Sequence, residues 1–528
     1  MCFRKVLYFW GVNFSNFNTL IQFINMFKNH PKGLIAAALA NMGERFGFYT
    51  MMAILVLFLQ SKFGLDGGNA GIIYSIFYAL IYVLALVGGL IADKTRNYKG
   101  TILAGLIVMA GGYLLLSIPT PTPVPNKALF LTFSCVALFL IAFGNGLFKG
   151  NLQALVGQMY DNEKYGKMRD SGFSLFYMFI NVGAMFAPLV APELRKWWLK
   201  THGFYYEAGL PSLCHQQLNG TLSGESHAKF AELAQTASIS GDVPANLSNF
   251  AADYLNIFTT GFHYAFGVAI IAMLISVVIY MANKKGFPDP KNKVKTAAGT
   301  NAVEMSTQEI RQRIWALFAV YGVVIFFWFS FHQNGLTLTF FARDYTELKL
   351  FGMSIAVEHF QSVNPFIVVF LTPVILGFFG WLRSKNMEPS TPKKIAIGMG
   401  IAATAFILMA VVSKMSNLPL HSEIVGRSSV LVTPFLLIGT YFILTVAELF
   451  ISPLGISFVS KVAPPHLQGL MQGGWLAATA IGNQFLFIGA IFYESIPIWA
   501  TWTIFVAACV ISMFTMLFML KWLEKVAK

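Results

Sequence analysis

Charged residues are scarce in this chain. Asp, Glu, Lys and Arg make up only 11% of its 528 residues, whereas 56% are hydrophobic and the mean hydropathy is +0.63. Soluble domains carry roughly 25% charged residues, so an ordinary soluble fold is excluded. Cysteine is scarce too: the four cysteines have neither pairing nor metal-binding spacing, and we expect no disulfide framework. We find no nucleophile, metal or phosphate-loop motif, which argues against an enzyme and against a bound cofactor.

The sequence contains many long runs of apolar residues. Each is close to the roughly 20 residues that a helix needs to cross a bilayer. Because lipid offers no partners to backbone polar groups, such runs must be helices. We therefore predict an all-α polytopic membrane protein with twelve spans, at residues 34–60, 70–92, 100–118, 128–150, 171–197, 261–283, 313–341, 361–382, 394–413, 430–454, 469–492 and 497–521.

The positions of Lys and Arg predict the orientation of these spans. Most of the 37 basic residues fall in or beside segments that are cytoplasmic if the N-terminus is, including the basic stretch 284–313. We therefore expect both termini in the cytoplasm and the chain in a cell (inner or plasma) membrane. The net charge of +14 follows from this topology and does not indicate nucleic-acid binding.

The spans fall into two sets of six. We expect a cytoplasmic segment 1–33, a six-helix bundle 34–283, a cytoplasmic linker 284–312 and a second six-helix bundle 313–528. Similar Gly-flanked basic turns follow the second and eighth spans, as expected of parallel repeats. The polar insertion 199–260 lies between spans five and six. We expect it to be a solvated loop rather than a lid or docking site, with a possible short amphipathic helix at 226–237.

Few ionisable side chains lie within the spans, where a charge costs roughly 2.5–3.5 kcal/mol. Glu44 and Arg45 are neighbours, so they point about 100° apart on a helix and we expect each to need a partner across the bundle. Lys149 is a candidate partner for Glu44, although it also fits a lysine that snorkels to the membrane surface. Glu448 supplies an acid in the other half. Instead of a role in transport, Glu44, Arg45 and Lys149 could form an ion cluster that only holds two helices together. Buried ion pairs contribute little to stability, which argues against this alternative.

Several motifs in the same order resemble the proton-dependent oligopeptide transporters, a branch of the major facilitator superfamily. The most specific is FSLFYMFINVGA at 173–184, which contains an intact F-Y-x-x-I-N-x-G motif. The opening segment Asn41–Tyr49 is similar to that family's E-x-x-E-R-F-x-Y-Y motif. Further matches lie at 88–102, 146–151 (GLFKGN), 361–365, 447–464 and 473–483, so the resemblance covers nearly all of 34–523.

This resemblance implies the major facilitator fold and proton-coupled uptake of di- and tripeptides by alternating access. The peptide's carboxylate is then expected to face Lys149, and its amino group to face Glu448 and Asn364. Residues at or near lining positions are Tyr82, Asn181, Trp328 and Trp475. A charge network is expected at Glu44 and Arg45. The protein is expected to be a monomer in the lipid bilayer, with protons as the coupling ion and no cofactor.

Three departures from the family pattern fall on the expected proton path. Asn41 stands where the family has its first glutamate, and Met52 replaces a base on the same helix face. His332 stands in FHQ where an acid is usual; a histidine can exchange a proton near neutral pH, although it can also merely bind a backbone carbonyl. Glu448, Glu44 and His332 therefore remain candidate proton carriers. Two alternatives stay open: a transporter of nitrate or an organic anion, and an uncoupled peptide facilitator or receptor.

Overall fold

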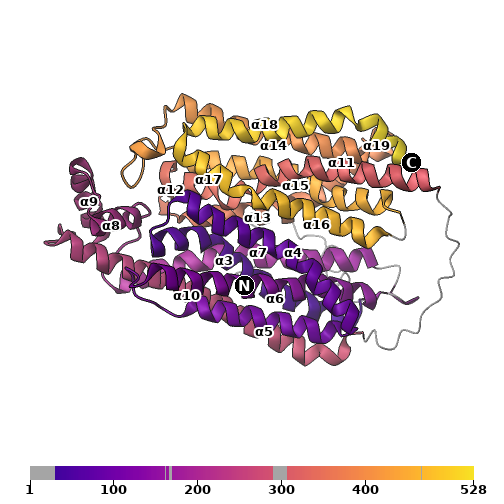
Figure 1. Cartoon of the computed structure of the whole chain (residues 1–528), viewed down its shortest axis with the longest axis horizontal. Coiled ribbons are helices and arrows are strands. Elements are labelled where there is room, and N and C mark those ends of the chain that lie inside the picture. Colours follow the sequence, from indigo (N-terminus) through magenta and orange to yellow (C-terminus); the bar gives the residue numbers. More distant parts are fainter. Residues whose placement is uncertain (1–29, 161, 166–168, 289–305, 465–466, 528) are drawn as a thin grey trace, which may run out of the picture.

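The structure is a computed structural model that describes residues 30–160, 162–165, 169–288, 306–464 and 467–527. The expected segment 1–33 and linker 284–312 therefore lie largely outside the described residues. Within those residues, twelve helices are long and apolar enough to cross a membrane, which confirms the predicted number of spans. Two bundles lie side by side, with the first half (indigo to magenta) below the second half (orange to yellow) in Figure 1.

Six long helices build the first half: α3 (Lys32–Phe63), α4 (Gly67–Thr95), α5 (Tyr98–Ser117), α6 (Lys127–Met159), α7 (Arg169–Thr201) and α10 (Leu247–Asn283). The second half contains α11 (Thr307–Phe331), α12 (Thr337–Tyr345), α13 (Val363–Ser384), α14 (Thr391–Met415), α15 (Pro434–Val462), α16 (Gln468–Gln484), α17 (Leu486–Ser495), α18 (Ile498–Phe518) and α19 (Leu520–Val526). Short elements are the 3₁₀ helices η2 (Lys284–Gly286), η4 (His332–Gly335), η5 (Val357–Ser362) and η6 (His421–Glu423), and the antiparallel strands β1 (Lys349–Leu350) and β2 (Met353–Ser354).

The first span, α3, is the most buried of the twelve, with 83% of its apolar window inside the protein. Its polar side chains therefore face other helices rather than lipid. Glycines allow the neighbouring helices to approach closely. A Cβ added to Gly88 on α4 would lie 2.1 Å from the carbonyl oxygen of Gly146 on α6, so only glycine fits this crossing.

The seventh span is interrupted. α11 ends at Phe331, a 3₁₀ turn spans His332–Gly335, and α12 begins at Thr337. A break frees backbone carbonyls that need other partners. Tyr441 on α15 supplies one, because its hydroxyl donates to the carbonyl of Asn334 at 2.7 Å. The break therefore presents a polar turn between the halves, with His332 at its start.

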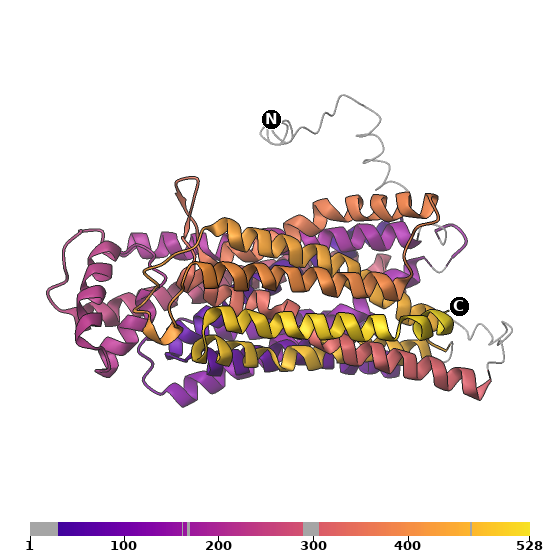
Figure 2. The same ribbon diagram turned by 90° about the horizontal axis from the view of Figure 1, so that it is seen from above.

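The insertion is folded, which corrects the expectation of a solvated loop. α7 continues to Thr201, α8 (Leu210–Asn219) and α9 (Gly224–Ala237) follow, and α10 already begins at Leu247. The amphipathic helix expected at 226–237 is confirmed as α9. Apolar side chains hold α8 and α9 together, among them Leu210, Leu213, Phe230 and Ala234, all fully buried. We call this end of the molecule the insertion end; it carries α8 and α9 at the left of Figure 1 and in the view from above in Figure 2.

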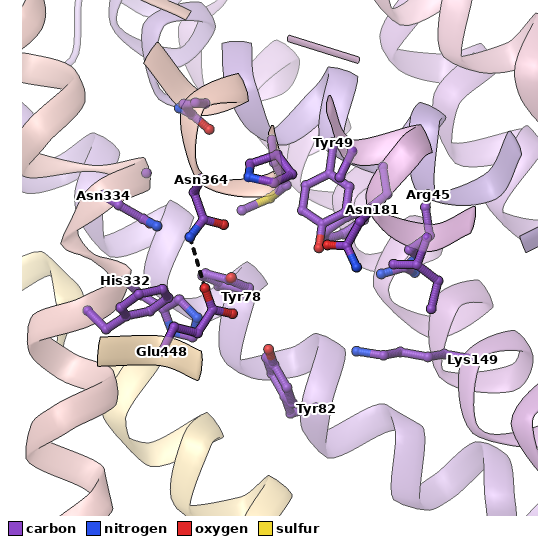
Figure 3. Close-up of a pocket in the computed structure, with 18 of the residues that line it drawn as sticks. Arg45, Tyr49, Tyr78, Tyr82, Lys149, Asn181, His332, Asn334, Asn364 and Glu448 are labelled. Carbon is purple, nitrogen blue, oxygen red and sulfur yellow. Dashed lines mark hydrogen bonds between the residues drawn. The ribbon is translucent and has the colours of Figure 1, made fainter. Parts of the chain in front are cut away.

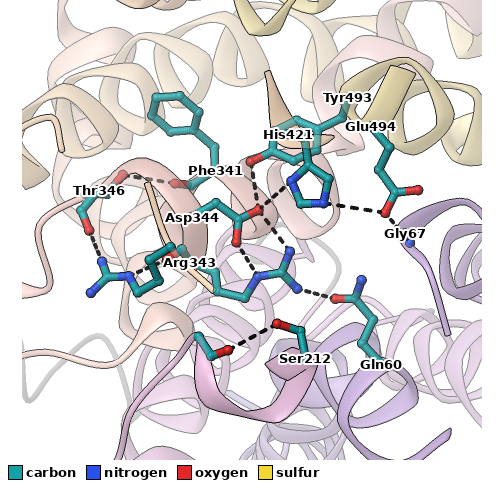
Figure 4. Close-up of polar contacts among 12 residues, drawn as sticks. Gln60, Gly67, Ser212, Phe341, Arg343, Asp344, Thr346, His421, Tyr493 and Glu494 are labelled. Carbon is teal, nitrogen blue, oxygen red and sulfur yellow. Dashed lines mark hydrogen bonds and ion pairs between the residues drawn. The ribbon is translucent and has the colours of Figure 1, made fainter. Parts of the chain in front are cut away.

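Hydrogen bonds and ion pairs between the two halves gather at the insertion end among the described residues. Arg195 on α7 pairs with Glu358 on η5 at 2.6 Å. Arg343 on α12 donates to Gln60 on α3 at 2.5 Å, and the backbone N–H of Gly67 on α4 donates to Glu494 on α17 at 2.5 Å (Figure 4). The halves are therefore drawn together at this end.

Candidate functional site

A cavity of about 260 Å³ lies between the two halves, and we call it the central cavity. Helices α3, α4, α6 and α7 line it from the first half; α11, η4, α13 and α15 line it from the second half. This volume is slightly below the roughly 300–1,000 Å³ of pockets for drug-sized ligands, which indicates a small solute.

An acidic group forms one wall of the central cavity. Glu448 lies on α15, and its Oε2 accepts a hydrogen bond of 2.9 Å from the side-chain amide of Asn364 on α13 (Figure 3). The same amide nitrogen donates to the hydroxyl of Thr445 at 2.9 Å. Thr445 lies almost one turn before Glu448, so one amide fixes both side chains. The carboxylate of Glu448 keeps lone pairs that are free to accept from a cationic ligand.

Lys149 lies across the cavity from Glu448, on a different helix, α6 (Figure 3). Its ammonium nitrogen lies 5.1 Å from the ring centre of Tyr82 on α4, a cation–π contact. It makes no ion pair with any described residue. Its positive charge is therefore available to an anionic group in the cavity.

Glu44 and Arg45 pair with each other, contrary to the expectation that they could not. Arg45 Nε lies 2.5 Å from Glu44 Oε2, and Arg45 Nη2 lies 2.7 Å from Glu44 Oε1. The roughly 100° between neighbouring residues on a helix is overcome because both side chains are long enough to meet. Glu44 also has a partner across the bundle, but this is Asn145 on α6, which donates at 2.8 Å. Asn145 lies one turn before Lys149, the partner proposed from the sequence.

His332 begins the break in the seventh span and faces the central cavity. Its Nδ1 lies 2.5 Å from the side-chain oxygen of Asn483 on α16. The ring of Trp328 stacks on it at 4.9 Å, and that of Tyr78 lies at 4.8 Å. A neutral ring that donates from Nδ1 to this oxygen has an unprotonated Nε2.

The central cavity brings together most of the residues that the sequence points to. Its lining includes Asn41, Arg45, Tyr82, Lys149, Asn181, Trp328, His332, Asn364 and Glu448. Glu44 lies behind Arg45 and is fully buried. Trp475 is not part of this lining; its ring packs against Gly455, where an added Cβ would lie 1.9 Å from the ring.

Sequence reasoning missed other lining residues: Tyr49, Tyr74, Tyr78, Asn334, Gln361 and Tyr441. A signal exists for two of them, because Tyr74, Tyr78 and Tyr82 recur every four residues and so lie on one face of α4. Asn145 and Asn483 were missed as well. Nothing in their spacing alone indicates which buried charge or ring they bind.

The described part of the chain has twelve helices long and apolar enough to span a membrane, in two halves with a charged cavity between them, which defines a membrane transporter rather than an enzyme. The chain belongs to the POT family, whose sequence profile matches residues 99–305 and 289–498. It is similar to the peptide transporter YePEPT of Yersinia enterocolitica, with 30% identity over 468 residues that cover 87% of each chain. It is also similar to dipeptide and tripeptide permease A of Escherichia coli K12, with 26% identity over 467 residues, 87% of this chain and 84% of the relative.

The fold agrees with this assignment. A crystal structure of a mutant of the peptide transporter POT in complex with alafosfalin has a TM-score of 0.71 and 25% identity to this chain. The match covers 95% of this chain and 96% of that one. The protein is therefore a multi-pass membrane protein with the fold of the POT transporters.

Proposed function

We propose that this protein takes up di- and tripeptides by alternating access, driven by the inward movement of protons. The observation that carries the proposal is the opposite charge on the two walls of one small cavity: Glu448 with Asn364 on one side and Lys149 on the other. A short peptide is a zwitterion whose two ends match these walls. The names of two similar proteins, a peptide transporter and a dipeptide and tripeptide permease, support the same substrate class.

The walls between the two charges explain how one site accepts many side chains. They are largely aromatic, with Tyr49, Tyr78, Tyr82 and Trp328 exposing rings to the central cavity. Rings offer a broad apolar surface without demanding a particular hydrogen-bonding partner. The two charged ends fix the position of the peptide, and its side chains contact the rings. Recognition is then strict for length and tolerant of sequence.

Proton coupling has two candidate carriers that face the central cavity, Glu448 and His332. Asn41 cannot exchange a proton, and Glu44 is already held by Arg45 and Asn145. The free Nε2 of His332 is able to accept a proton without breaking the contact with Asn483. We propose that His332 takes over part of the role left by the missing acid at Asn41.

Alternating access requires the halves to open at one end while they close at the other. We propose that the insertion end faces outward, because the basic segments cluster at the opposite end. Both termini then lie in the cytoplasm, and the protein works as a monomer in the cell membrane. The contacts at the insertion end hold the outer entrance shut in this conformation.

The deciding experiment is uptake of a labelled dipeptide into proteoliposomes, with an inward proton gradient and with none. We expect accumulation only with the gradient. Equal equilibration under both conditions would identify an uncoupled facilitator, the alternative that Asn41 keeps open. Absence of dipeptide counterflow would overturn the peptide assignment and favour another small solute such as nitrate or an organic anion.

A further inference from the structure

A second and larger cavity of about 430 Å³ lies nearer the insertion end, and we call it the outer cavity. It shares no lining residue with the central cavity. Along α3 the central cavity is lined between Asn41 and Met52, and the outer cavity between Leu57 and Ser61. Helix α8 of the insertion forms part of its wall, and so do Gln60, Arg343 and Glu494, which join the two halves. The outer cavity thus lies among those contacts, at the insertion end.

Arg195, whose charge is paired with that of Glu358, gives this cavity two N–H donors without partners among the described residues. The side chain is 1% exposed, and only its Nη1 reaches Glu358, at 2.6 Å. Its Nε and Nη2 have no hydrogen-bond partner among the described residues. The rings of Tyr206, Phe258 and Phe262 surround the guanidinium at 4.8, 5.0 and 4.5 Å. These two N–H groups are covered in this conformation, and they have the planar geometry that suits a carboxylate.

The opposite charge comes from Glu494. One oxygen accepts from the N–H of Gly67 at 2.5 Å, while the other has only a long contact of 3.3 Å with the N–H of Gly68. The side chain is 24% exposed, so it keeps capacity for an ammonium group. Asp344 is less available, because both of its oxygens are bonded to Arg343 and one also to Tyr493 (Figure 4).

Two histidines also line the outer cavity. His421 Nε2 lies 3.9 Å from Glu494, and its Nδ1 lies 3.5 Å from Asp344. Burial lowers the pKa of His215, and its ring bonds the carbonyl of Ser61 at 2.8 Å, so it is neutral at pH 7 and adds no charge. Asp66 also lines the cavity, and its carboxylate binds Asn69. Arg195, which pairs with Glu358 through Nη1 alone, and Glu494 keep further hydrogen-bonding capacity, and they come from different halves.

We infer that the outer cavity is a second binding site for small ampholytes, which holds the carboxylate of a short peptide at Arg195 and its amino group at Glu494. The choice of a peptide rests on the proposed function; the pairing of a carboxylate with an ammonium group rests on the cavity itself. A peptide bound here waits on the entrance side of the central cavity and contacts both halves.

The test uses a cysteine that reports on the outer cavity alone. Gln216 on α8 lines this cavity, is exposed and makes no side-chain hydrogen bond among the described contacts. We would label Gln216→Cys in whole cells with a membrane-impermeant thiosulfonate, in a Glu448→Gln background that disables the central cavity. Ala228→Cys on α9, exposed but outside both linings, is the matched control, and the chain without an added cysteine gives the background from the native thiols.

We expect a millimolar dipeptide to slow the labelling of Gln216→Cys and leave Ala228→Cys unchanged. A dipeptide with an amidated carboxyl end should not protect. Arg195→Lys keeps the charge that Glu358 needs but removes the planar fork, so it should raise the protecting concentration about tenfold.

Absence of protection, or equal protection by the amidated peptide, would overturn the outer site. Dipeptide counterflow by the wild-type protein is measured alongside. Counterflow without protection rejects the outer site only, whereas failure of counterflow rejects the proposed function. Protection without counterflow would leave an ampholyte site on a protein that transports something else.

Discussion

Glu44 and Arg45 form a closed pair within one helix, and this changes what a substitution there should do. Both side chains are almost fully buried, and two hydrogen bonds of 2.5 and 2.7 Å join them. A buried ion pair adds little net stability, but removal of one partner leaves an uncompensated charge. Replacing one of the two residues should therefore destabilise the protein strongly, whereas replacing both should destabilise it less.

We predict that Arg45→Gln and Glu44→Gln each lower the free energy of unfolding by about 3–5 kcal/mol, because each leaves one buried charge unpaired. The double variant should lose clearly less than the sum. Thermal unfolding of the four proteins in one detergent measures the coupling. Losses that simply add would mean that each residue depends on different partners, as the sequence alone suggests.

Glu448 is the single group whose charge the peptide hypothesis needs most. Glu448→Gln keeps the shape and the contact with Asn364 but removes the negative charge. Hydrogen bonds to a charged group contribute about 1.5–3 kcal/mol, so dipeptide affinity should fall about 10–100-fold and uptake should be lost. Competition binding and uptake measure the two effects. Glu524→Gln, the same change on α19 at the hydroxyl of Ser390, is the control and should transport normally.

At the residue scale, the sequence predicts which residues line the central cavity better than it predicts their contacts with each other. Lys149, Asn364 and Glu448 stand out because polar groups are expensive within a span. Their common cavity follows from the resemblance to a family and is what the structure contains. The pairing of Glu44 with Arg45 depends on side-chain torsions that helical spacing does not encode. Trp475 does not line the central cavity, although the resemblance to the family suggested that it lies at or near a lining position. Its ring packs on Gly455, and helical spacing does not encode this contact between α15 and α16.

At the scale of helices, the spans and α9 are predictable from the sequence, whereas the rest of the folded insertion is not. Length and apolarity alone define a spanning helix, whereas α8 and α9 are short and rich in polar residues. Their apolar faces are buried against each other and against α10, which packs with α8, and the sequence does not show this packing. The early start of α10, at Leu247, likewise depends on this packing.

Close crossings between helices give a prediction about the position of Lys149. Gly146 lies almost one turn before it, and an added Cβ would lie 2.4 Å from the carbonyl oxygen of Leu84 on α4. Gly146→Ala must therefore push α6 from α4 and shift the lysine away from Tyr82. Gly150, in the same motif, has open space around it, and helical Gly→Ala substitutions are favourable by about 0.5–1 kcal/mol. We expect Gly146→Ala to lose most dipeptide uptake and Gly150→Ala to keep it, at equal amounts of protein in the membrane.

At the scale of the whole molecule, transport requires the insertion end to separate. α4 and α17 hold the halves together there, and a Cβ added to Gly71 would lie 3.0 Å from the Cβ of Ala490. Disulfides join residues whose Cβ atoms are about 3.5–4.5 Å apart, so a small local shift allows a bond between cysteines at these two positions. Gly71→Cys/Ala490→Cys should lose dipeptide uptake on oxidation by copper phenanthroline and regain it with a reductant. Each single variant, treated in the same way, controls for the native thiols. If the oxidised, cross-linked protein still takes up dipeptide, the insertion end does not open during transport, and the entrance must lie elsewhere between the halves.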